Sequence, residues 1–550
     1  MSKFADAFLV LMVALCITYL PVLWRTQPPI VTDGFVAPGF EEVARTFRAN
    51  FENGLDSRTD GSAFAAYYRG EKVVDIWGGY ADVESQQKWK QDTVTMTFSS
   101  TKGVAAVCLA ILVDRGLLDY DQTVATYWPE FAQKGKENIT VRHLLGHKAG
   151  LVLSAPPGFT LETLRDVAKS GQLMAEAEPL WEVDGKTQGY HLFSYGPLTN
   201  ELLRRVDSKH RTMGEFFRDE VAIPFGIDFY IGLPLEENYR TARLRVSDTS
   251  PLIQMWTGLA SPKTRKMALH TIRSDLLKRA LQNTGEAGQA KIFNNPENRA
   301  LEIPSCTGFG RAESLAKFYG ILAVGGTDPA TNRTLLSPER IHDFVNGGTS
   351  TLDLTLGFHI NFNLGFAVGK YDFQDCCTVF GHAGAGGQIA YADPESQLGF
   401  SFVSSYLAPT IASDDRRNHT LELDCGTAAI HIVEASYARP SGAKECGEPE
   451  VSGTECQASN TLLVVKATCE GRPACSMLIS SDNFEPPCQA THNYLEVRHE
   501  CCLIRVGMVG ESTPTLEWQE TDAYPIGSIG VHSLLRSNAD WMFSAPCVWE

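Results

Sequence analysis

The chain has 550 residues, of which 43% are hydrophobic and 10% aromatic, so it is long and apolar enough for more than one domain with a large core. Lys and Arg total 48 against 65 Asp and Glu, which gives a formal net charge of −17 at pH 7. Phosphate binding needs a basic face, and the sequence has no block of Lys or Arg, so nucleic acid is excluded as an expected partner.

The N-terminal segment differs from the rest of the chain. Residues 5–24 are almost wholly apolar, with Lys3 before them and Arg25 after them. A run of about 20 residues suits a signal peptide or a membrane-spanning helix, and both alternatives stay open for residues 1–30. Because no small-x-small cleavage site is evident, we favour an uncleaved single-pass anchor, with the catalytic domain lumenal or extracellular, over a secreted protein. Three sequons compatible with this route lie at Asn138, Asn332 and Asn418.

Apolar periodicity and turn residues predict a series of helices and strands after this segment. The expected elements are a linker at 26–35, a helix at 41–52, a strand at 63–76, a buried helix that ends at Gly116, mixed helices to about residue 340, and alternating strands at 364–368, 388–392 and 398–404. The glycine-rich segment 381–387 then falls where we expect an edge strand of the sheet.

The motif Ser99-Ser-Thr-Lys102 opens the buried helix. A serine at a helix N-terminus gains from the dipole and the free N–H groups, and Lys102 lies one turn further on the same face. We therefore predict that Ser99 is a nucleophile and Lys102 its proton acceptor. The same spacing recurs at Ser85, Ser314 and Ser441. Those motifs do not open a buried helix after a strand, so context separates them from Ser99.

Two further motifs complete the candidate site. Tyr195, in Ser194-Tyr-Gly-Pro197, supplies a phenol that could share the proton of Ser99 with Lys102. Lysine and tyrosine both have reference pKa values of about 10, so the pKa of one of them must be lowered. His382 lies in the glycine-rich segment, whose backbone N–H groups could bind an oxyanion. The alternatives are a structural ring for Tyr195 and a strand histidine for His382, and we expect His147 to be a structural turn residue.

These motifs, together with Asp75-Ile-Trp-Gly-Gly79, 123–131 and 144–151, resemble the serine beta-lactamase-related family of class C beta-lactamases, penicillin-binding proteins and esterases. Within it the chain is most similar to the LACTB-like branch, especially nematode proteins with a membrane-proximal N-terminus. The resemblance implies an α/β (α+β) sheet with a helical subdomain over residues 36–410, and an active site between them. It also implies an acyl-enzyme mechanism that uses no cofactor and no metal.

The resemblance also assigns the oxyanion donors and bears on the substrate. The amides of Ser99 and Ala385, the latter beside Gly384, would form the oxyanion hole. A histidine of reference pKa about 6.5 stands at position 382 where relatives have lysine. We therefore expect neutral esters or amides as substrates in preference to beta-lactams.

The sequence departs from the family after the last strand. Relatives continue into a long helix that packs on the sheet, whereas this chain runs into a cysteine-rich region. We therefore expect another segment to cover that face of the sheet.

The cysteine-rich region reads as a disulfide scaffold. Its cysteines are Cys425, Cys446, Cys456, Cys469, Cys475, Cys488, Cys501 and Cys502. Zinc is the alternative, but no pair among them has Cys-x-x-Cys spacing.

Residues 419–502 resemble the galactose/rhamnose-binding lectins of the sea urchin egg type. The matching motifs are 430–439, Cys469-Glu-Gly-Arg-Pro-Ala-Cys475, Phe484-Glu-Pro-Pro-Cys488 and 494–497. The resemblance implies the pairs Cys425–Cys501, Cys456–Cys488 and Cys469–Cys475. Since the family's first cysteine is absent, we expect a compensating pair between Cys446 and Cys502.

Sugar binding by this module is an open question at the level of sequence. Tyr437 and Arg439 match residues that contact sugar in the lectin family. Three other contact positions are replaced, by Arg417, Pro486 and Asn493. The tail 503–550 stays unassigned.

Two other accounts of the whole chain remain. One is a surface carbohydrate-binding protein with an inert hydrolase domain, although Ser99 and Lys102 are both present. The other is a homo-oligomer or filament scaffold, which the LACTB resemblance suggests. The expected partners are therefore an ester or amide substrate, a glycan, a membrane through the N-terminal segment, and further copies of the chain.

Overall fold

The computed structural model describes residues 29–52, 60–156, 158–246, 269–270, 273–371 and 374–407, and the strand segments 419–424, 429–438, 474–479, 494–507 and 515–520. Up to residue 407 the strands are β1 (Thr32–Val36), β2 (Gly61–Tyr68), β3 (Glu71–Asp82), β4 (Gln87–Lys88), β5 (Thr95–Met96), β6 (Phe229–Ile231), β7 (Arg245–Val246), β8 (Gly308–Gly310), β9 (Thr327–Asp328), β10 (Arg333–Thr334), β11 (Thr351–Leu352), β12 (His359–Asn363), β13 (Phe366–Tyr371), β14 (Gln374–Gly384), β15 (Gln388–Asp393), β16 (Leu398–Ser404) and β17 (Tyr406–Leu407).

The α-helices are α2 (Glu41–Glu52), α3 (Thr101–Asp114), α4 (Val124–Tyr127), α5 (Val141–Leu145), α6 (Leu161–Leu164), α7 (Val167–Ala175), α8 (Tyr195–Val206), α9 (Met213–Phe217), α10 (Ile223–Phe225), α13 (Asp275–Asn283), α14 (Pro296–Arg299), α15 (Ala312–Ala323) and α16 (Pro338–Val345). The short 3-10 and π segments are η1 (Phe98–Ser100), η2 (Pro129–Phe131), η3 (Arg218–Ala222), η4 (Leu235–Arg240), η5 (Gly285–Gly288) and η6 (Ala290–Asn294).

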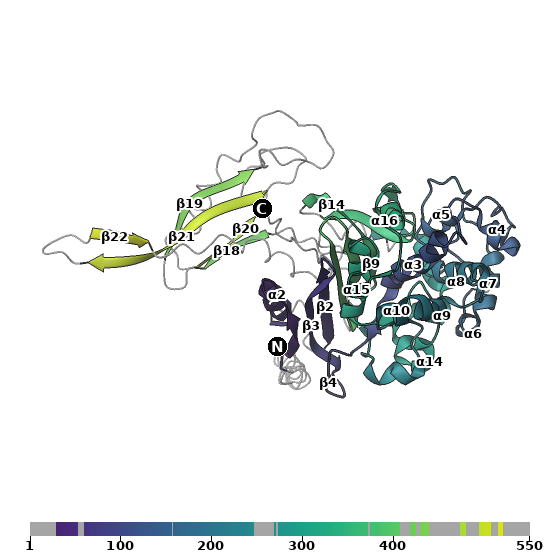
Figure 1. Ribbon diagram of the computed structural model, residues 1–550, viewed down its shortest axis with the longest axis horizontal. Coiled ribbons are helices and arrows are strands. Elements are labelled where there is room, and N and C mark those ends of the chain that lie inside the picture. Colours follow the sequence, from purple (N-terminus) through teal and green to yellow (C-terminus); the bar gives the residue numbers. More distant parts are fainter. Residues whose placement is uncertain are drawn as a thin grey trace, which may run out of the picture.

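One large antiparallel sheet organises this region (Figure 1). Its strands follow the order β1-β3-β2-β16-β15-β14-β13-β12-β11, with β4 paired to β3. The helix expected at 41–52 and the strands expected near 364–368, 388–392 and 398–404 are confirmed as α2, β13, β15 and β16. The expectation of one strand at 63–76 is wrong, because Arg69 and Gly70 form a turn there that separates β2 from β3.

The position of β14 also corrects an expectation. This strand was expected at the edge of the sheet, but β15 pairs with it on one side and β13 on the other. Its pairing with β13 ends at Gly381, whereas its pairing with β15 continues to Gly384. The last residues of β14 therefore have a neighbouring strand on one side only, and they can approach another element on the other side.

Helices cover both faces of the sheet. On one face, Val43, Phe47 and Phe51 of α2 pack in a buried cluster with residues of β2, β3 and β16. On the other face, α15 crosses β16 so closely that a Cβ on Gly399 would lie 2.1 Å from the backbone nitrogen of Gly320. Glycine allows this approach because it has no side chain.

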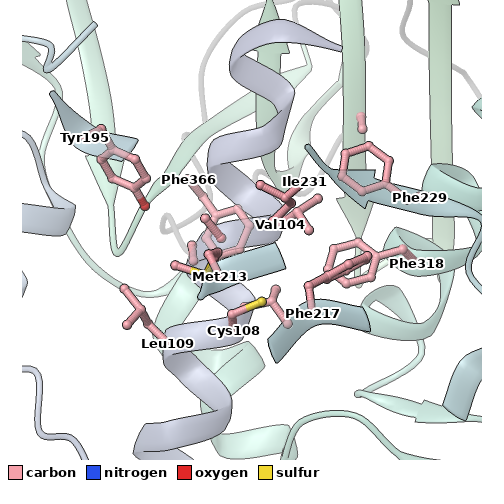
Figure 2. Close-up of a cluster of buried hydrophobic side chains, with 14 of the residues drawn as sticks. Val104, Cys108, Leu109, Tyr195, Met213, Phe217, Phe229, Ile231, Phe318 and Phe366 are labelled. Carbon is pink, nitrogen blue, oxygen red and sulfur yellow. The ribbon is translucent and has the colours of Figure 1, made fainter. Parts of the chain in front are cut away.

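Helix α3 is the centre of the larger core. Its residues from Thr101 to Leu112 are all buried, as expected of a helix that is apolar on every side. Figure 2 shows Val104, Cys108 and Leu109 of α3 among side chains from other elements, including Phe217 and Phe366. Helices α4 to α9 lie at the end of this region away from α2 (Figure 1). Together they form the helical subdomain expected from the family resemblance.

The C-terminal strands form two small antiparallel sheets. The strands are β18 (His419–Asp424), β19 (Ala429–Ala438), β20 (Ala474–Ile479), β21 (Tyr494–Gly507) and β22 (Thr515–Glu520). Strand β18 pairs with β20, and β21 lies between β19 and β22. Tyr437 lies in β19, opposite Leu495.

Several expectations fall outside the described residues. These are the disulfide pairs, Arg439, Asn418 and the apolar run 5–24. Within the described ranges, no helix is both long and apolar enough to cross a membrane. The family's closing helix is also not among the described elements, which beyond α16 are all strands, yet Phe400 and Phe402 of β16 are buried.

Candidate active site

The turn before α3 fixes the position of Ser99. Strand β5 leads into η1, where Phe98 adopts the left-handed region with φ of 48°, a conformation uncommon for a residue with a side chain. The hydroxyl of Thr101 donates to the carbonyl of Phe98 at 2.6 Å and accepts from the amide of Gly308 at 2.9 Å. The turn is thus tied to β8, and Ser99 is half-buried at the N-terminus of α3.

Lys102 extends from the first turn of α3 back to Ser99. Its Nζ lies 3.2 Å from Oγ of Ser99, 2.9 Å from the carbonyl of Leu192 and 3.0 Å from the carbonyl of Ser305. The side chain is fully buried. Burial disfavours the charged form and lowers the pKa of Lys102 to about 7. Near neutral pH a substantial fraction of this amine is therefore uncharged.

Tyr190, which the sequence did not single out, faces the same two residues. Its ring lies beneath the amine of Lys102, with Nζ 4.8 Å from the ring centroid. Burial raises the pKa of Tyr190, while a side-chain hydrogen bond with Ser99 acts in the opposite direction. The net effect keeps the phenol protonated at neutral pH. Ser99, Lys102 and Tyr190 thus form one contact group.

Tyr195 does not belong to this group, which corrects the expectation from its motif. Its hydroxyl lies 3.5 Å from the backbone carbonyl of Lys102, and a Cβ on Gly365 would lie 2.5 Å from it. Figure 2 shows the ring among the apolar side chains that pack around α3. The reason is that Tyr195 begins α8, whose first turn packs against α3, so its hydroxyl points toward the core. The alternative of a structural ring describes this residue.

The loop that carries Tyr190 is held by His147 and His191. The amide of Gly189 donates to the carbonyl of His147 at 3.0 Å, and the amide of His191 donates to Nδ1 of His147 at 3.1 Å. Nε2 of His191 accepts from the amide of Leu151 at 3.1 Å. Burial lowers the pKa of both imidazoles, so neither is charged at neutral pH. His147 thus holds the loop of Tyr190 through its backbone carbonyl and through Nδ1 of its ring.

The end of β14 lies against the nucleophile turn. The hydroxyl of Ser100 donates to the carbonyl of His382 at 3.0 Å. A Cβ on Gly384 would lie 2.2 Å from the carbonyl of Thr97, so only glycine allows this approach. Ala385 follows directly and is exposed. The free side of β14 therefore brings the Gly384–Ala385 backbone beside Ser99.

The ring of His382 is buried in the wall of the site. It stacks on Phe362 and lies 5.9 Å from the ring of Tyr190, centroid to centroid. Its Nδ1 lies 2.6 Å from the carbonyl of Ala383 and must carry the proton, since a carbonyl only accepts. Burial, and then the charge of Lys102, lower the pKa of His382 to about 3. The imidazole is therefore neutral at physiological pH.

The other predicted site residues that can be placed lie away from this group. Asn138 and Asn332 are exposed on surface turns. Ser314, which shares the Ser-x-x-Lys spacing, is fully buried in α15 and accepts a hydrogen bond from the amide of Asp228. Over the described ranges, no group of three His, Cys, Asp or Glu side chains is arranged to hold a metal ion.

Comparison with known proteins identifies two family domains. The beta-lactamase family model matches residues 47–423, and the D-galactoside/L-rhamnose binding SUEL lectin domain matches residues 423–501. The esterase/beta-lactamase LipL of Mycobacterium tuberculosis is 32% identical over 391 residues, which cover 69% of this chain and 85% of that protein. Mouse mitochondrial serine beta-lactamase-like protein LACTB is 38% identical, but over 84 residues, or 15% of its length.

The lectin match is local. L-rhamnose-binding lectin CSL1 of Oncorhynchus keta is 39% identical over 83 residues, which are 15% of this chain and 29% of that lectin.

Solved structures give the same result for the first domain. A family VIII carboxylesterase is 33% identical with a TM-score of 0.61, and the match covers 70% of this chain and 96% of that one. A penicillin-binding protein homologue from Caulobacter crescentus is 34% identical with a TM-score of 0.58, and the match covers 70% and 95% of the two chains. The chain therefore belongs to the beta-lactamase family and is a serine hydrolase of that family, followed along the sequence by a SUEL lectin domain.

Proposed function

We propose that this protein is an esterase that forms an acyl-enzyme on Ser99 from neutral esters or amides. The observation that carries the proposal is the position of Lys102, a fully buried amine whose Nζ lies 3.2 Å from Oγ of Ser99 and whose pKa is lowered to about 7. A nucleophilic hydroxyl needs a base within hydrogen-bond reach that is uncharged at the working pH. Lys102 meets both requirements.

The two carbonyl contacts orient the amine. A neutral lysine amine has two hydrogens and one lone pair. The carbonyls of Leu192 and Ser305 accept the two hydrogens, which directs the lone pair toward the hydroxyl of Ser99. As Ser99 attacks the substrate carbonyl, its proton moves to Nζ of Lys102. The resulting ammonium donates to the same two carbonyls, so the charge that forms there is stabilised.

Tyr190 acts as a proton donor in this scheme. Because burial keeps its hydroxyl protonated, Tyr190 is not a phenolate base. Its contact with Ser99 places it where the leaving alkoxide or amine departs, so it passes its proton to that group and is reprotonated from Lys102. In deacylation the neutral amine of Lys102 takes one proton from the attacking water, and that proton returns to Oγ of Ser99 as the acyl group leaves.

The amides of Ser99 and Ala385 bind the oxyanion. The close approach of Gly384 to the carbonyl of Thr97 supports this assignment, because it brings the end of β14 beside the nucleophile turn. Removing one such donor from a hydrolase costs about 3 kcal/mol of transition-state stabilisation.

The neutral imidazole of His382 favours uncharged acyl groups. A permanent cation at this position would attract a substrate carboxylate, whereas His382 has a pKa of about 3. Two matched proteins are named as esterases or carboxylesterases, which favours esters. The test compares hydrolysis of p-nitrophenyl butyrate with turnover of a penicillin by the purified chain. Saturable ester hydrolysis with at least a hundredfold lower kcat/KM for the penicillin supports the proposal, and the reverse preference contradicts it.

A glycan is the second ligand we propose, through the SUEL lectin domain. The family match at residues 423–501 supports it.

The apolar run 5–24 and the exposed sequon residues Asn138 and Asn332 support a secretory route, with the chain either anchored in a membrane or secreted.

The alternative of an inert hydrolase domain is disfavoured by the intact contact group of Ser99, Lys102 and Tyr190. Self-association, which the LACTB resemblance suggests, would be visible as an early elution volume.

A further inference from the structure

A buried carboxylate is bonded to the backbone of Tyr190. Asp353 follows β11, and its side chain is fully buried. A single oxygen, Oδ1, accepts from the amides of Tyr190 at 3.0 Å, Thr355 at 3.0 Å and Leu356 at 2.9 Å. The second oxygen, Oδ2, accepts from the side-chain amide of Gln188 at 3.2 Å. Asp353 thus joins the turn that follows it to the loop of Tyr190, more than 160 residues earlier in the chain.

Backbone contacts strengthen this junction. The amide of Leu354 donates to the carbonyl of Gln188 at 2.9 Å, and the amide of Asp353 donates to the carbonyl of Phe358 at 3.0 Å. In the part of the chain that the structure describes, Asp353 has no ion-pair partner, so its hydrogen bonds come from neutral groups. A buried carboxylate without a counter-ion is costly unless hydrogen bonds to it are well formed. The turn at 353–356 could close on its own two amides, so the bonds to Gln188 and Tyr190 are additional.

The Tyr190 loop is held at two backbone positions, the amide of Tyr190 and the carbonyl of Leu192. The carbonyl of Leu192 accepts from Nζ of Lys102 at 2.9 Å. The amide of Tyr190 is held by Asp353 alone among the described contacts. Loss of that bond would free the residue that carries the proton-donating hydroxyl, while Lys102 and Ser99 would keep their contact.

We propose that Asp353 is a positioning residue that acts through Tyr190, holding its hydroxyl at Ser99 through the backbone amide. This rests on the role proposed above for Tyr190. Asp353 does not touch the substrate in this account. A displacement of about 1 Å at a catalytic group can reduce the rate by about a hundredfold, so the effect of losing the bond is expected on kcat.

The chain contains a closely matched control carboxylate. Asp393, at the end of β15, is also fully buried, and its Oδ1 accepts from the amides of Glu395 and Ser396, each at 3.0 Å. These are the residues two and three positions later, as for Asp353. What Asp393 lacks is a bond to the Tyr190 loop. The variants Asp353→Ala and Asp393→Ala therefore remove the same kind of turn-closing carboxylate, and only the first removes the acceptor of the Tyr190 amide.

The test is a double-mutant cycle on the full chain with an alkyl ester such as ethyl butyrate, whose leaving alkoxide needs a proton. We expect Asp353→Ala to lower kcat by about 10- to 100-fold with KM changed less than about threefold, and Asp393→Ala to change kcat by less than about threefold. In the Tyr190→Phe background, Asp353→Ala should cause almost no further loss, because the hydroxyl that it positions is gone. An equal loss in both backgrounds would overturn the proposal, as would an equal loss from Asp393→Ala.

The outcomes separate this inference from the proposed function. If Tyr190→Phe alone retains full activity, the role of Tyr190 fails, and the inference about Asp353 fails with it. If Tyr190→Phe is slow and Asp353→Ala is as fast as the parent, only the inference fails. Thermal unfolding of each variant shows whether it is folded. Should Asp353→Ala not fold, Asp353→Ser, which keeps one hydroxyl acceptor and leaves room for water, takes its place in the cycle with the same expected and contrary results.

Discussion

Nζ of Lys102 lies 3.2 Å from Oγ of Ser99, and its two other polar neighbours are backbone carbonyls rather than carboxylates. The absence of a carboxylate partner from these contacts matters, since an acidic neighbour would raise the pKa of the amine. Burial instead lowers that pKa to about 7. The geometry thus makes Lys102 a base that changes charge near neutral pH.

The rate of acylation should rise with pH. Below pH 7 Lys102 is protonated and cannot accept the proton of Ser99, and above it the amine is free. We expect kcat/KM for a neutral ester to increase about tenfold per pH unit below the midpoint and to level off above it, with the midpoint near pH 7. Steady-state kinetics from pH 5 to 9 measure this. A flat profile over that range would show that Lys102 is not the base.

Replacement of Lys102 separates its charge from its size. Lys102→Arg should lower kcat by about a hundredfold or more, because a guanidinium does not deprotonate in this range. Steady-state kinetics of this variant measure the loss, and a kcat equal to that of the parent would contradict it.

The lowered pKa of Lys102 also predicts how stability depends on pH. In the unfolded chain the lysine pKa returns to about 10.4, so between pH 7 and 10 the unfolded state binds more protons than the folded state. The contribution of Lys102 to the unfolding free energy therefore rises with pH over this window. Denaturant unfolding of Lys102→Met should lack that rise, and its persistence would place the titrating group elsewhere.

Two tyrosines five positions apart should respond differently to loss of the hydroxyl. Tyr190→Phe removes a group that contacts Ser99, so we expect kcat to fall by about a hundredfold or more. Tyr195→Phe removes a hydroxyl in the core whose hydrogen-bond contact with the described residues is long, at 3.5 Å, so kcat should change by less than about threefold. Equal circular dichroism spectra of the two variants control for folding. The opposite ranking would restore Tyr195 to the site.

These two tyrosines show which residues of the site can be predicted from the sequence and which cannot. Ser99 and Lys102 follow from sequence because their pairing is local, one turn apart on a buried helix. The partner phenol comes from a loop whose direction depends on His147, on Asp353 and on where α8 begins, and no local pattern distinguishes Tyr190 from Tyr195. Gly189-Tyr190-His191 lies shortly before the helix that Tyr195 begins, and this position alone does not identify a catalytic phenol.

The strands show the same limit. Alternation of apolar residues predicted β13, β15 and β16, but pairing order is a property of the whole sheet. The free side of β14 arises because its pairing with β13 stops at Gly381. That register could not be inferred from residues 381–387 alone.

The charge state of His382 sets a prediction about substrates. With a pKa of about 3 the imidazole stays neutral from pH 5 to 8, so the preference between acyl groups should not change over that range. We expect the ratio of kcat/KM for a butyrate ester to that for the corresponding hemisuccinate ester to stay constant within about twofold. His382→Gln should show the same constant ratio. A ratio that shifts about tenfold toward the hemisuccinate at pH 5 would mean that His382 becomes charged.

Free monosaccharides should bind the lectin domain weakly. The lectin resemblance implies that three contact positions are replaced, by Arg417, Pro486 and Asn493, and a neutral hydrogen bond contributes about 1 kcal/mol. Loss of three such bonds weakens binding by more than about a hundredfold. Titration calorimetry of the full Ser99→Ala chain with rhamnose and galactose should show no saturation below millimolar concentration. Clear saturation there would mean that the replaced positions are not the contacts.

The identity of the nucleophile is the central claim, and covalent trapping tests it most directly. The chain supplies a matched control in Ser314, which has the same spacing to a lysine but is fully buried in α15. After a brief pulse with an activated ester, intact-mass measurement should show one added acyl group on the parent and on Ser314→Ala. Ser99→Ala should show none, and peptide mapping of the parent should place the acyl group on the peptide that contains Ser99. An adduct that persists in the Ser99→Ala variant would contradict the account.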